Sequence, residues 1–285
     1  MPVLPRRGAD VLRERAPAKV NLILHVGRRR HDGLHELCSL FAPLELADEL
    51  SFAPAEGPRD EVVCPGVEGR NLAQKALEAF RTRTALPPLR VEIEKRIPVA
   101  GGLGGGSADA AAALRAANRL VGEPLELDEL QALGARLGAD VPSQLRPTPA
   151  LVTGAGERVE PMELPPLWLV LVPSDEGLST ADVYGELDRL GGGRQILDPA
   201  ALGALAGAGA ERLAQVAEND LEAPAVSLRP ELAQKLSDLR DHASLAARLS
   251  GSGPTAFGLF DGREAADRAA GALTGAVLTR TTTAA

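Results

Sequence analysis

Hydrophobic and polar residues alternate near the start of the chain. Over 19–26, aliphatic residues fill every second position, and Lys19 and Asn21 stand between them. A period of two predicts a β-strand, and it places Lys19 and Asn21 on one face of that strand. Two further strands are expected, over 48–53 and 90–96.

An alanine-rich run follows a glycine cluster at 101–106. Alanine is the best helix former, and Ser107 is a residue type that often caps a helix N-terminus. Gly122 is a typical helix stop, so the sequence predicts a helix over 107–121. Leucines at helical spacing predict a second helix over 128–138.

A proline-rich break at 161–166 separates two parts of the chain. Directly behind it, the apolar run 168–172 predicts a buried strand. We therefore expect a first domain over 1–163, opening with a loose extension at 1–10, and a second domain over 164–285. Strands and helices mix without strict βαβ alternation, which favours the α+β class. The second domain is expected to hold helices over 211–218 and 230–248, a strand over 256–260, and a surface loop with a helix in the stretches 191–193 and 200–210.

The charge balance bears on the kind of partner. The 285 residues include 31 Lys and Arg against 39 Asp and Glu, a net charge of −8. A nucleic-acid partner needs a basic surface, so this composition argues against one. Two cysteines are too few for a disulfide framework. Neither a signal peptide nor an apolar run of about 18 residues is seen, so we expect a cytoplasmic protein with no membrane partner.

The segment PVAGGLGGGSAD at 98–109 carries the strongest chemical signal. Glycines let a backbone approach a ligand without obstruction by Cβ atoms. Successive N–H groups at a helix N-terminus then form a nest that favours an anion such as a triphosphate. The spacing differs from the Walker A loop and from the dinucleotide fingerprint. A flexible linker is the alternative, although a linker would not normally run straight into so strong a helix.

Other candidate residues have ordinary structural explanations when each is taken alone. Asp140 precedes a valine and a proline and is a common kind of turn residue. Lys19 is equally an exposed strand lysine, and His35 a structural histidine. The glycine- and serine-rich segment 249–255 is equally a tight connection between a helix and a strand.

Five segments taken together resemble the GHMP kinase superfamily. Their order and spacing are near those of the superfamily, and the resemblance runs from about residue 16 to 260. The segments are APAKVNL at 16–22, DGLHE at 32–36, KRIPVAGGLGGGS at 95–107, LGADVP at 137–142 and LSGSGPT at 249–255.

The resemblance implies a two-domain α+β fold, with a left-handed βαβ unit in the N-terminal domain and a ferredoxin-like C-terminal domain. The substrate would lie in the cleft between the domains. Within the superfamily, the segments are similar to the branch that phosphorylates the 2-hydroxyl of 4-diphosphocytidyl-2-C-methyl-D-erythritol with ATP and Mg²⁺, in non-mevalonate isoprenoid synthesis. The implied partner is thus a small molecule with a cytidine diphosphate group, bound by a monomer or a homodimer.

The resemblance also implies roles for individual residues. Asp140 would accept or orient the hydroxyl proton, and Lys19 would stabilise charge on the transferring phosphoryl group. Ser107 is the candidate protein contact for Mg²⁺. Nucleotide contacts are implied for Asn71, Lys95, Pro98, Val99, Ala100, Gly101, Gly102, Leu103, Gly104, Gly105, Gly106 and Ser107. Substrate contacts are implied for Asn21, Leu34, His35, Thr180 and Tyr184.

The chain departs from the superfamily pattern at a few positions. Leu34 stands where an aromatic residue usually flanks the cytosine, and Leu has no π-face. Ala100 replaces a frequent glycine of the ATP loop, and Ser143 with Gln144 replaces apolar or aromatic residues. An alcohol kinase with a different substrate therefore stays open as an alternative. A non-catalytic nucleotide-binding homologue is the other alternative, and the presence of both Lys19 and Asp140 speaks against it.

Overall fold

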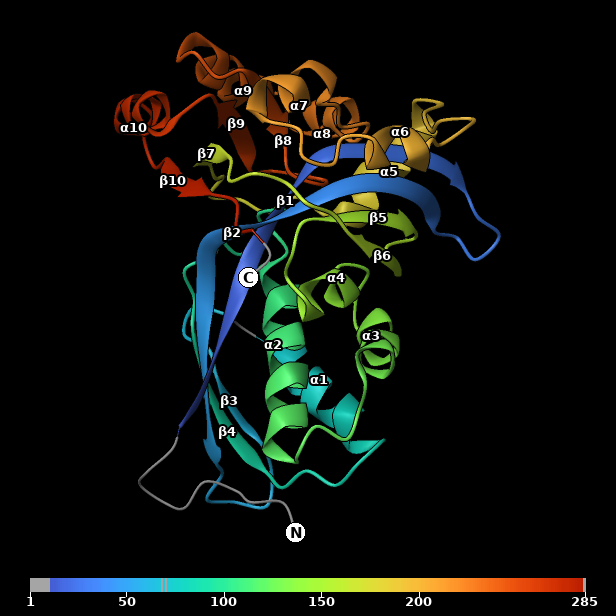
Figure 1. Cartoon of the computed structure of the whole chain (residues 1–285), viewed down its shortest axis with the longest axis vertical. Coiled ribbons are helices and arrows are strands. Elements are labelled where there is room, and N and C mark those ends of the chain that lie inside the picture. The colour runs from blue at the N-terminus through green and yellow to red at the C-terminus, as the bar shows by residue number, and fades with distance from the viewer. Residues whose placement is uncertain (1–10, 68, 70, 284–285) are drawn as a thin grey trace. The chain divides into compact units, whose positions relative to one another are not determined.

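A computed structural model describes residues 11–67, 69 and 71–283 of the chain (Figure 1). The expected loose extension at 1–10 lies outside the described residues. The chain forms two compact units, each built from several stretches of sequence. Of the described residues, unit 1 comprises 11–18, 46–67, 69, 71–99 and 104–147, and unit 2 comprises 19–45, 100–103 and 148–283.

The two units do not follow a single cut in the sequence. Each compact unit combines separate stretches of the chain, so the units do not test the expected domain boundary after residue 163. That boundary stays a prediction. Two long paired strands, β1 (Leu12–Arg29) and β2 (His35–Pro54), each contribute residues to both units. The glycine-rich segment is also divided, because 100–103 belongs to unit 2 and 104–107 to unit 1.

Unit 1 is built on a parallel βαβ motif. Strand β3 pairs in parallel with β4, and helix α1 lies between them in sequence, while β4 pairs antiparallel with the end of β2. Helix α2 packs against α1 and α4. The elements besides β1 and β2 are β3 (Glu61–Val63), α1 (Leu72–Arg81), β4 (Leu89–Glu94), α2 (Gly105–Leu120), α3 (Leu127–Ala135) and α4 (Val141–Leu145).

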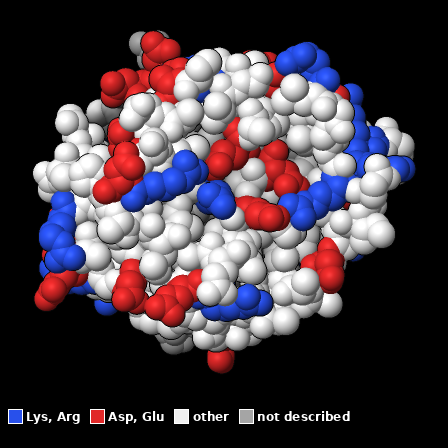
Figure 2. Space-filling view, turned by 90° about the horizontal axis from the view of Figure 1, so that it is seen from above, with Lys and Arg blue, Asp and Glu red and all other residues white. Residues whose placement is uncertain are grey.

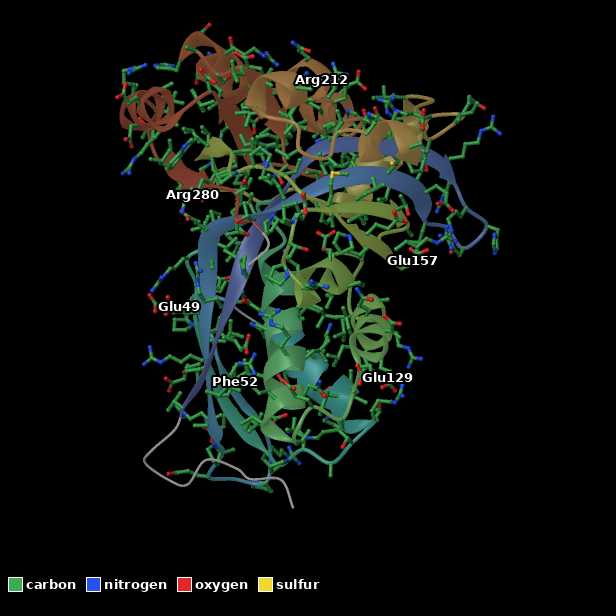
Figure 3. The ribbon with its side chains drawn as sticks, viewed as in Figure 1. Glu49, Phe52, Glu129, Glu157, Arg212 and Arg280 are labelled. Atoms are coloured by element: carbon green, nitrogen blue, oxygen red, sulfur yellow. The ribbon has the colours of Figure 1, made fainter. Side chains whose placement is uncertain are left out.

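The core of unit 1 explains the alanine-rich composition of α2. All seven alanines of this helix are buried, and their small side chains let neighbouring helices approach closely. Phe52 on β2 (labelled in Figure 3) and Phe80 on α1 are fully buried in the same core. Burial of such aromatic side chains contributes roughly 1.5–3 kcal/mol each.

Unit 2 contains a four-stranded antiparallel sheet in the order β10-β7-β9-β8. Helix α9 lies in sequence between β7 and β8, and α10 between β9 and β10, which is the split βαβ arrangement of ferredoxin-like domains. Unit 2 comprises β5 (Ala150–Gly154), β6 (Arg158–Pro161), β7 (Trp168–Val172), α5 (Thr180–Arg189), α6 (Pro199–Gly203), α7 (Ala210–Val216), α8 (Glu222–Leu228), α9 (Leu232–Asp241), β8 (Ala246–Leu249), β9 (Ala256–Phe260), α10 (Arg263–Ala272) and β10 (Val277–Arg280), with parts of β1 and β2.

The α+β prediction is confirmed, and several element predictions are confirmed with it. The strands predicted over 168–172 and 256–260 are β7 and β9, and the helix predicted over 211–218 is α7 within two residues. The helix predicted over 230–248 is wrong at its end. Helix α9 stops at Asp241 because Ala243 adopts a left-handed backbone, with φ of 62°, and β8 follows.

Acidic and basic side chains lie among uncharged atoms on the face drawn in Figure 2, and neither sign forms one continuous patch there. Among the described residues, none of the helices is both long and apolar enough to cross a bilayer.

The contact between α3 and α4 depends on a glycine. A Cβ atom on Gly134 would lie 2.9 Å from Val141 Cγ1 and 3.5 Å from Leu145 Cδ1. We therefore expect Gly134→Ala to lower the free energy of unfolding by about 1–3 kcal/mol, the usual effect of overpacking. Urea titration measures this change.

A second helical glycine provides the control. Nothing lies within 4 Å of a Cβ placed on Gly185 in α5. Gly185→Ala should raise the free energy of unfolding by about 0.5–1 kcal/mol, because alanine loses less backbone entropy. Equal shifts for the two variants would show that α3 and α4 are not closely packed at Gly134.

Candidate active site

Lys19 and Asn21 lie side by side on β1, as the alternation predicted. Lys19 Nζ donates to Asn21 Oδ1 at 2.7 Å, and Asn21 Nδ2 donates to Ser39 Oγ at 2.9 Å. Ser39 Oγ in turn donates to Ile23 O at 2.6 Å. The ammonium also lies 4.8 Å from the centre of the Phe41 ring, within reach of a cation–π interaction. These contacts hold a nearly buried cation in one place.

The first part of the glycine-rich segment lies against this strand. Lys19 N donates to Leu103 O at 2.9 Å. Gly102 has a φ of 75°, and a Cβ there would lie 2.4 Å from Ser250 O and 2.6 Å from Gly253 O. Ser250 Oγ donates to Gly102 O at 3.0 Å. Only glycine fits between these backbones, so the loop 249–255 packs directly on the phosphate-loop candidate.

The loop 249–255 also reaches the Lys19 face itself. A Cβ on Gly251 would lie 3.3 Å from Asn21 Oδ1 and 3.6 Å from Lys19 Nζ. On its other side, the hydroxyl groups of Thr180 and Ser252 share a hydrogen bond of 2.9 Å. The structure thus brings three sequence-predicted residues, Lys19, Asn21 and Thr180, to one loop.

The second part of the glycine-rich segment opens α2. The N-cap is Gly104, with a left-handed φ of 71°, and not Ser107 as the sequence predicted. The first intrahelical hydrogen bond runs from Ala108 N to Gly104 O. The N–H groups of Gly105, Gly106 and Ser107 therefore precede the hydrogen-bonded ladder, which is the arrangement that binds anions at helix N-termini.

Lys95 is held by two carboxylates at the entrance to this segment. Its Nζ donates to Asp109 Oδ2 at 2.9 Å and also to Asp48. Asp48 is fully buried and accepts from the backbone N–H groups of Arg96 and Ile97 at 2.6 and 2.8 Å. Burial raises the pKa of Asp109, against the nearby Lys95 charge. Burial opposes protonation of Lys95, but Asp109 and Asp48 raise the pKa of Lys95 overall.

Asp140 and Asn71 begin helices in unit 1. Asp140 occupies the N-cap position of the short helix α4, which the sequence analysis missed, and its carbonyl accepts from Ser143 Oγ at 2.8 Å. Asn71 Oδ1 accepts from Ala73 N at 2.8 Å and caps α1. A Cβ on Gly138, just before Asp140, would lie 3.6 Å from Ser107 Oγ. The segment that carries Asp140 thus runs past the start of α2.

A second group of predicted residues gathers in unit 2. The rings of His35 and Tyr184 have centroids 5.0 Å apart at an interplanar angle of 35°. His35 Nε2 lies 2.8 Å from Asp188 Oδ1, so the carboxylate favours the proton on Nε2 and leaves Nδ1 as an acceptor. Asp188 was not predicted, although it follows Tyr184 by one helical turn on α5. Leu34 is 55% exposed.

Comparisons with known proteins show the family of this chain. Residues 71–146 match the GHMP kinases N terminal domain, and 196–278 match the GHMP kinases C terminal domain. A Streptomyces avermitilis protein named 4-diphosphocytidyl-2-C-methyl-D-erythritol kinase is 43% identical over 273 residues, 91% of each chain. A protein of the same name from Anaeromyxobacter dehalogenans is 44% identical over 272 residues, 91% of this chain and 84% of its own.

A solved structure gives the same result. The crystal structure of a 4-(cytidine 5'-diphospho)-2C-methyl-D-erythritol kinase superposes with a TM-score of 0.77 at 38% identity, covering 95% of this chain and 99% of its own. The chain therefore belongs to the GHMP kinases and, among them, to the 4-diphosphocytidyl-2-C-methyl-D-erythritol kinase family.

Proposed function

We propose that this chain transfers the γ-phosphate of ATP to the 2-hydroxyl of 4-diphosphocytidyl-2-C-methyl-D-erythritol. The observation that carries the proposal is the hydrogen bond between the Lys19 backbone and Leu103. It joins β1, which carries a nearly buried cation, to a glycine-rich segment that leads into a helix N-terminus. A buried cation beside a phosphate-binding loop is suited to phosphoryl transfer, which depends mainly on positioning and electrostatic stabilisation.

In the proposed reaction the substrate oxygen attacks the γ-phosphorus. The bond from that phosphorus to the bridging oxygen of ADP breaks, and ADP leaves with the electron pair. Asp140 accepts the proton of the 2-hydroxyl as its oxygen forms the new bond. Lys19 stabilises the negative charge on the transferring group and on the attacking oxygen. The joint action of Lys19 and Asp140 on one hydroxyl is part of the proposal.

The residues near the start of α2 fit a magnesium ion that is held mostly by phosphates. Among the described residues, no cluster of three or more His, Cys, Asp or Glu side chains could form a metal cage. Mg²⁺ commonly keeps several waters and takes one or two protein ligands beside substrate phosphates. We propose the Ser107 hydroxyl as such a ligand. The bound ion would neutralise charge on the phosphates.

The group around His35 is proposed to bind the cytosine. His35 Nδ1 is left as an acceptor by the contact with Asp188, and it suits the exocyclic amine of cytosine. The Tyr184 ring offers a stacking surface beside it. Leu34 offers apolar contact without stacking. The missing aromatic ring at Leu34 favours the second candidate function, which is an alcohol kinase of the same superfamily whose substrate lacks the cytidyl group.

A coupled ADP assay distinguishes the two candidates. The purified chain would be given ATP with 4-diphosphocytidyl-2-C-methyl-D-erythritol or, separately, with methylerythritol phosphate. We expect ADP release only with the cytidyl compound, and a ³¹P NMR spectrum of the product with a new phosphomonoester at the 2-position. Turnover with both compounds would favour the second candidate, and turnover with neither would exclude the proposed function.

The role of Asp140 is tested by Asp140→Asn. The amide keeps the shape of the side chain but accepts no proton at neutral pH, so we expect kcat to fall by about 10²–10⁴-fold. ATP binding, measured by calorimetry, should be unchanged. Asp128→Asn, at an exposed position on α3, is the control and should leave kcat unchanged. A loss of less than about tenfold for Asp140→Asn would exclude it as the base.

The cytosine contact is tested by Leu34→Tyr. An added aromatic ring should contribute about 0.5–1.5 kcal/mol of stacking and lower KM for the cytidyl substrate by about 2–10-fold. Stacking is the same in the ground and transition states, so kcat should change little. Ile196→Tyr adds a ring at a position that is 83% exposed and serves as the control. An unchanged KM for Leu34→Tyr would place the cytosine elsewhere.

A further inference from the structure

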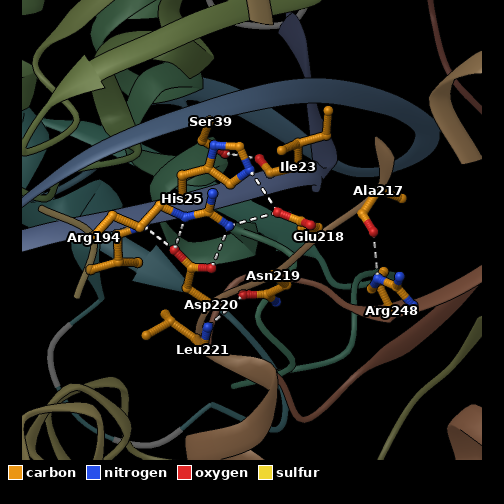
Figure 4. Close-up of polar contacts among 11 residues, drawn as sticks. Ile23, His25, Ser39, Arg194, Ala217, Glu218, Asn219, Asp220, Leu221 and Arg248 are labelled. Atoms are coloured by element: carbon orange, nitrogen blue, oxygen red, sulfur yellow. Dashed lines mark hydrogen bonds and ion pairs between the residues drawn. The ribbon is translucent and has the colours of Figure 1, made fainter. Parts of the chain in front are cut away.

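The segment 217–222 binds the start of the loop 249–255 through the side chains of Asn219 and Glu222, and Figure 4 shows its neighbouring contact with Arg248. Ala217 O accepts from Arg248 Nε at 2.8 Å, just before that loop begins. None of the five superfamily segments includes 217–222. Its contacts are nevertheless directed at a loop that touches Lys19 and Asn21.

Asn219 makes the central contacts of this segment. Its Nδ2 donates to Leu249 O and to Gly251 O, both at 2.8 Å. Its Oδ1 accepts from Leu221 N at 2.9 Å, and the side chain is 9% exposed. The two N–H groups of Nδ2 and the Oδ1 oxygen are thus all engaged in hydrogen bonds. Among side chains of this size, only the amide of asparagine supplies both kinds of group.

Glu222 binds the backbone N–H of Leu249, the first residue of the same loop. Glu222 Oε2 accepts from Leu249 N at 3.1 Å, so both backbone polar groups of Leu249 bind side chains of 217–222. Burial raises the pKa of Glu222, while the hydrogen bond from Leu249 opposes that rise. A neutral amide at this position would keep the acceptor without an ionisable group.

The segment 217–222 is itself fixed to β1, the strand that carries Lys19. Leu24 N donates to Glu218 O at 2.8 Å, and Asp220 N donates to Leu24 O at 3.0 Å. Asp220 Oδ2 also accepts from Val26 N at 2.8 Å. Arg194 joins the two acids, with Nε 2.7 Å from Asp220 Oδ2 and Nη2 2.6 Å from Glu218 Oε2 (Figure 4).

We propose that Asn219 is a positioning residue for the phosphoryl transfer, which holds the Gly251 backbone against the side chains of Lys19 and Asn21. The inference rests on the proposed function. It follows from the short distance between the Gly251 backbone and Lys19. Asn219 binds the carbonyl oxygen of Gly251, and a Cβ atom built on Gly251 would lie 3.6 Å from Lys19 Nζ. A shift of that backbone therefore moves the surroundings of the cation directly.

Two substitutions remove or weaken the donors of Asn219. Asn219→Asp keeps the shape and places a carboxylate opposite two carbonyl oxygens, and Asn219→Ser leaves a single short donor. A displacement of about 1 Å near reacting groups costs on the order of 10²-fold in rate. We therefore expect kcat of Asn219→Asp to fall by about that factor, with a smaller fall for Asn219→Ser and KM for ATP within about threefold of the parent value.

A second readout does not depend on turnover. Amide hydrogen exchange of the full chain, followed by mass spectrometry, reports opening of local structure. We expect exchange to quicken in peptides that cover 249–255 in both Asn219 variants. Peptides of unit 1 should be unaffected.

The matched control is another buried asparagine that ties down a loop. Asn118 Nδ2 donates to Leu125 O at 2.8 Å, and Asn118 Oδ1 accepts from Leu125 N at 3.1 Å. Asn118→Asp should lower the unfolding midpoint but leave kcat within about threefold. Glu222→Gln, which keeps the acceptor for Leu249 N, should also retain kcat, whereas Glu222→Leu should lower it.

The outcomes separate this inference from the proposed function. If the parent chain shows no turnover, the proposed function fails, and unchanged exchange at 249–255 would then also overturn the role of Asn219. If the parent chain is active, near-parent kcat in both Asn219 variants overturns the positioning role. An equal loss of kcat in Asn118→Asp overturns it as well. Should neither Asn219 variant fold, Glu222→Leu decides, and unchanged kcat there counts against the inference.

Discussion

The close approach of two backbones at Gly102 is the constraint on which the site in unit 2 depends. A side chain at this position would collide with Ser250 O and Gly253 O, and those contacts set the place of the whole loop 249–255. The loop in turn lies against Asn21 and Lys19. A nearly buried ammonium is stable only when it keeps polar partners, and Asn21 Oδ1, which accepts from Lys19 Nζ, is one of the atoms against which the loop lies.

Unit 1 holds a group of buried charged side chains beside the N-terminus of α2. Asp48 is completely buried, and its oxygens accept from Lys95 and from two backbone N–H groups. Asp109, on the first turns of α2, shares the same lysine. Breaking one member of such a buried group typically costs 3–5 kcal/mol, since the others remain uncompensated. Lys95 therefore orders the entry to α2 whether or not it also touches the nucleotide.

Local patterns predicted the parts of this protein that local forces determine. The apolar runs that form β7 and β9 and the alanine-rich helix α2 are examples, because propensity and periodicity act over a few residues. The predicted end of α9 was wrong, because the left-handed backbone at Ala243 interrupts a helical sequence pattern. Asn219 and Asp188 were missed for another reason. Their partners, Gly251 and His35, lie 32 and 153 positions away, and no short motif records such pairs.

The departure at Ala100 shows how a strained loop is accommodated. Its φ of 54° lies in the left-handed region, which costs a non-glycine residue roughly 1–2 kcal/mol. A Cβ on Gly177 would lie 2.8 Å from the Ala100 methyl, so the methyl group fits because its neighbour is a glycine. The next residues are held by hydrogen bonds, from Thr255 N to Gly101 O and from Lys19 N to Leu103 O. Strain persists where surrounding contacts determine the backbone, and a backbone fixed in this way is preorganised for the nucleotide contact that we propose for this segment.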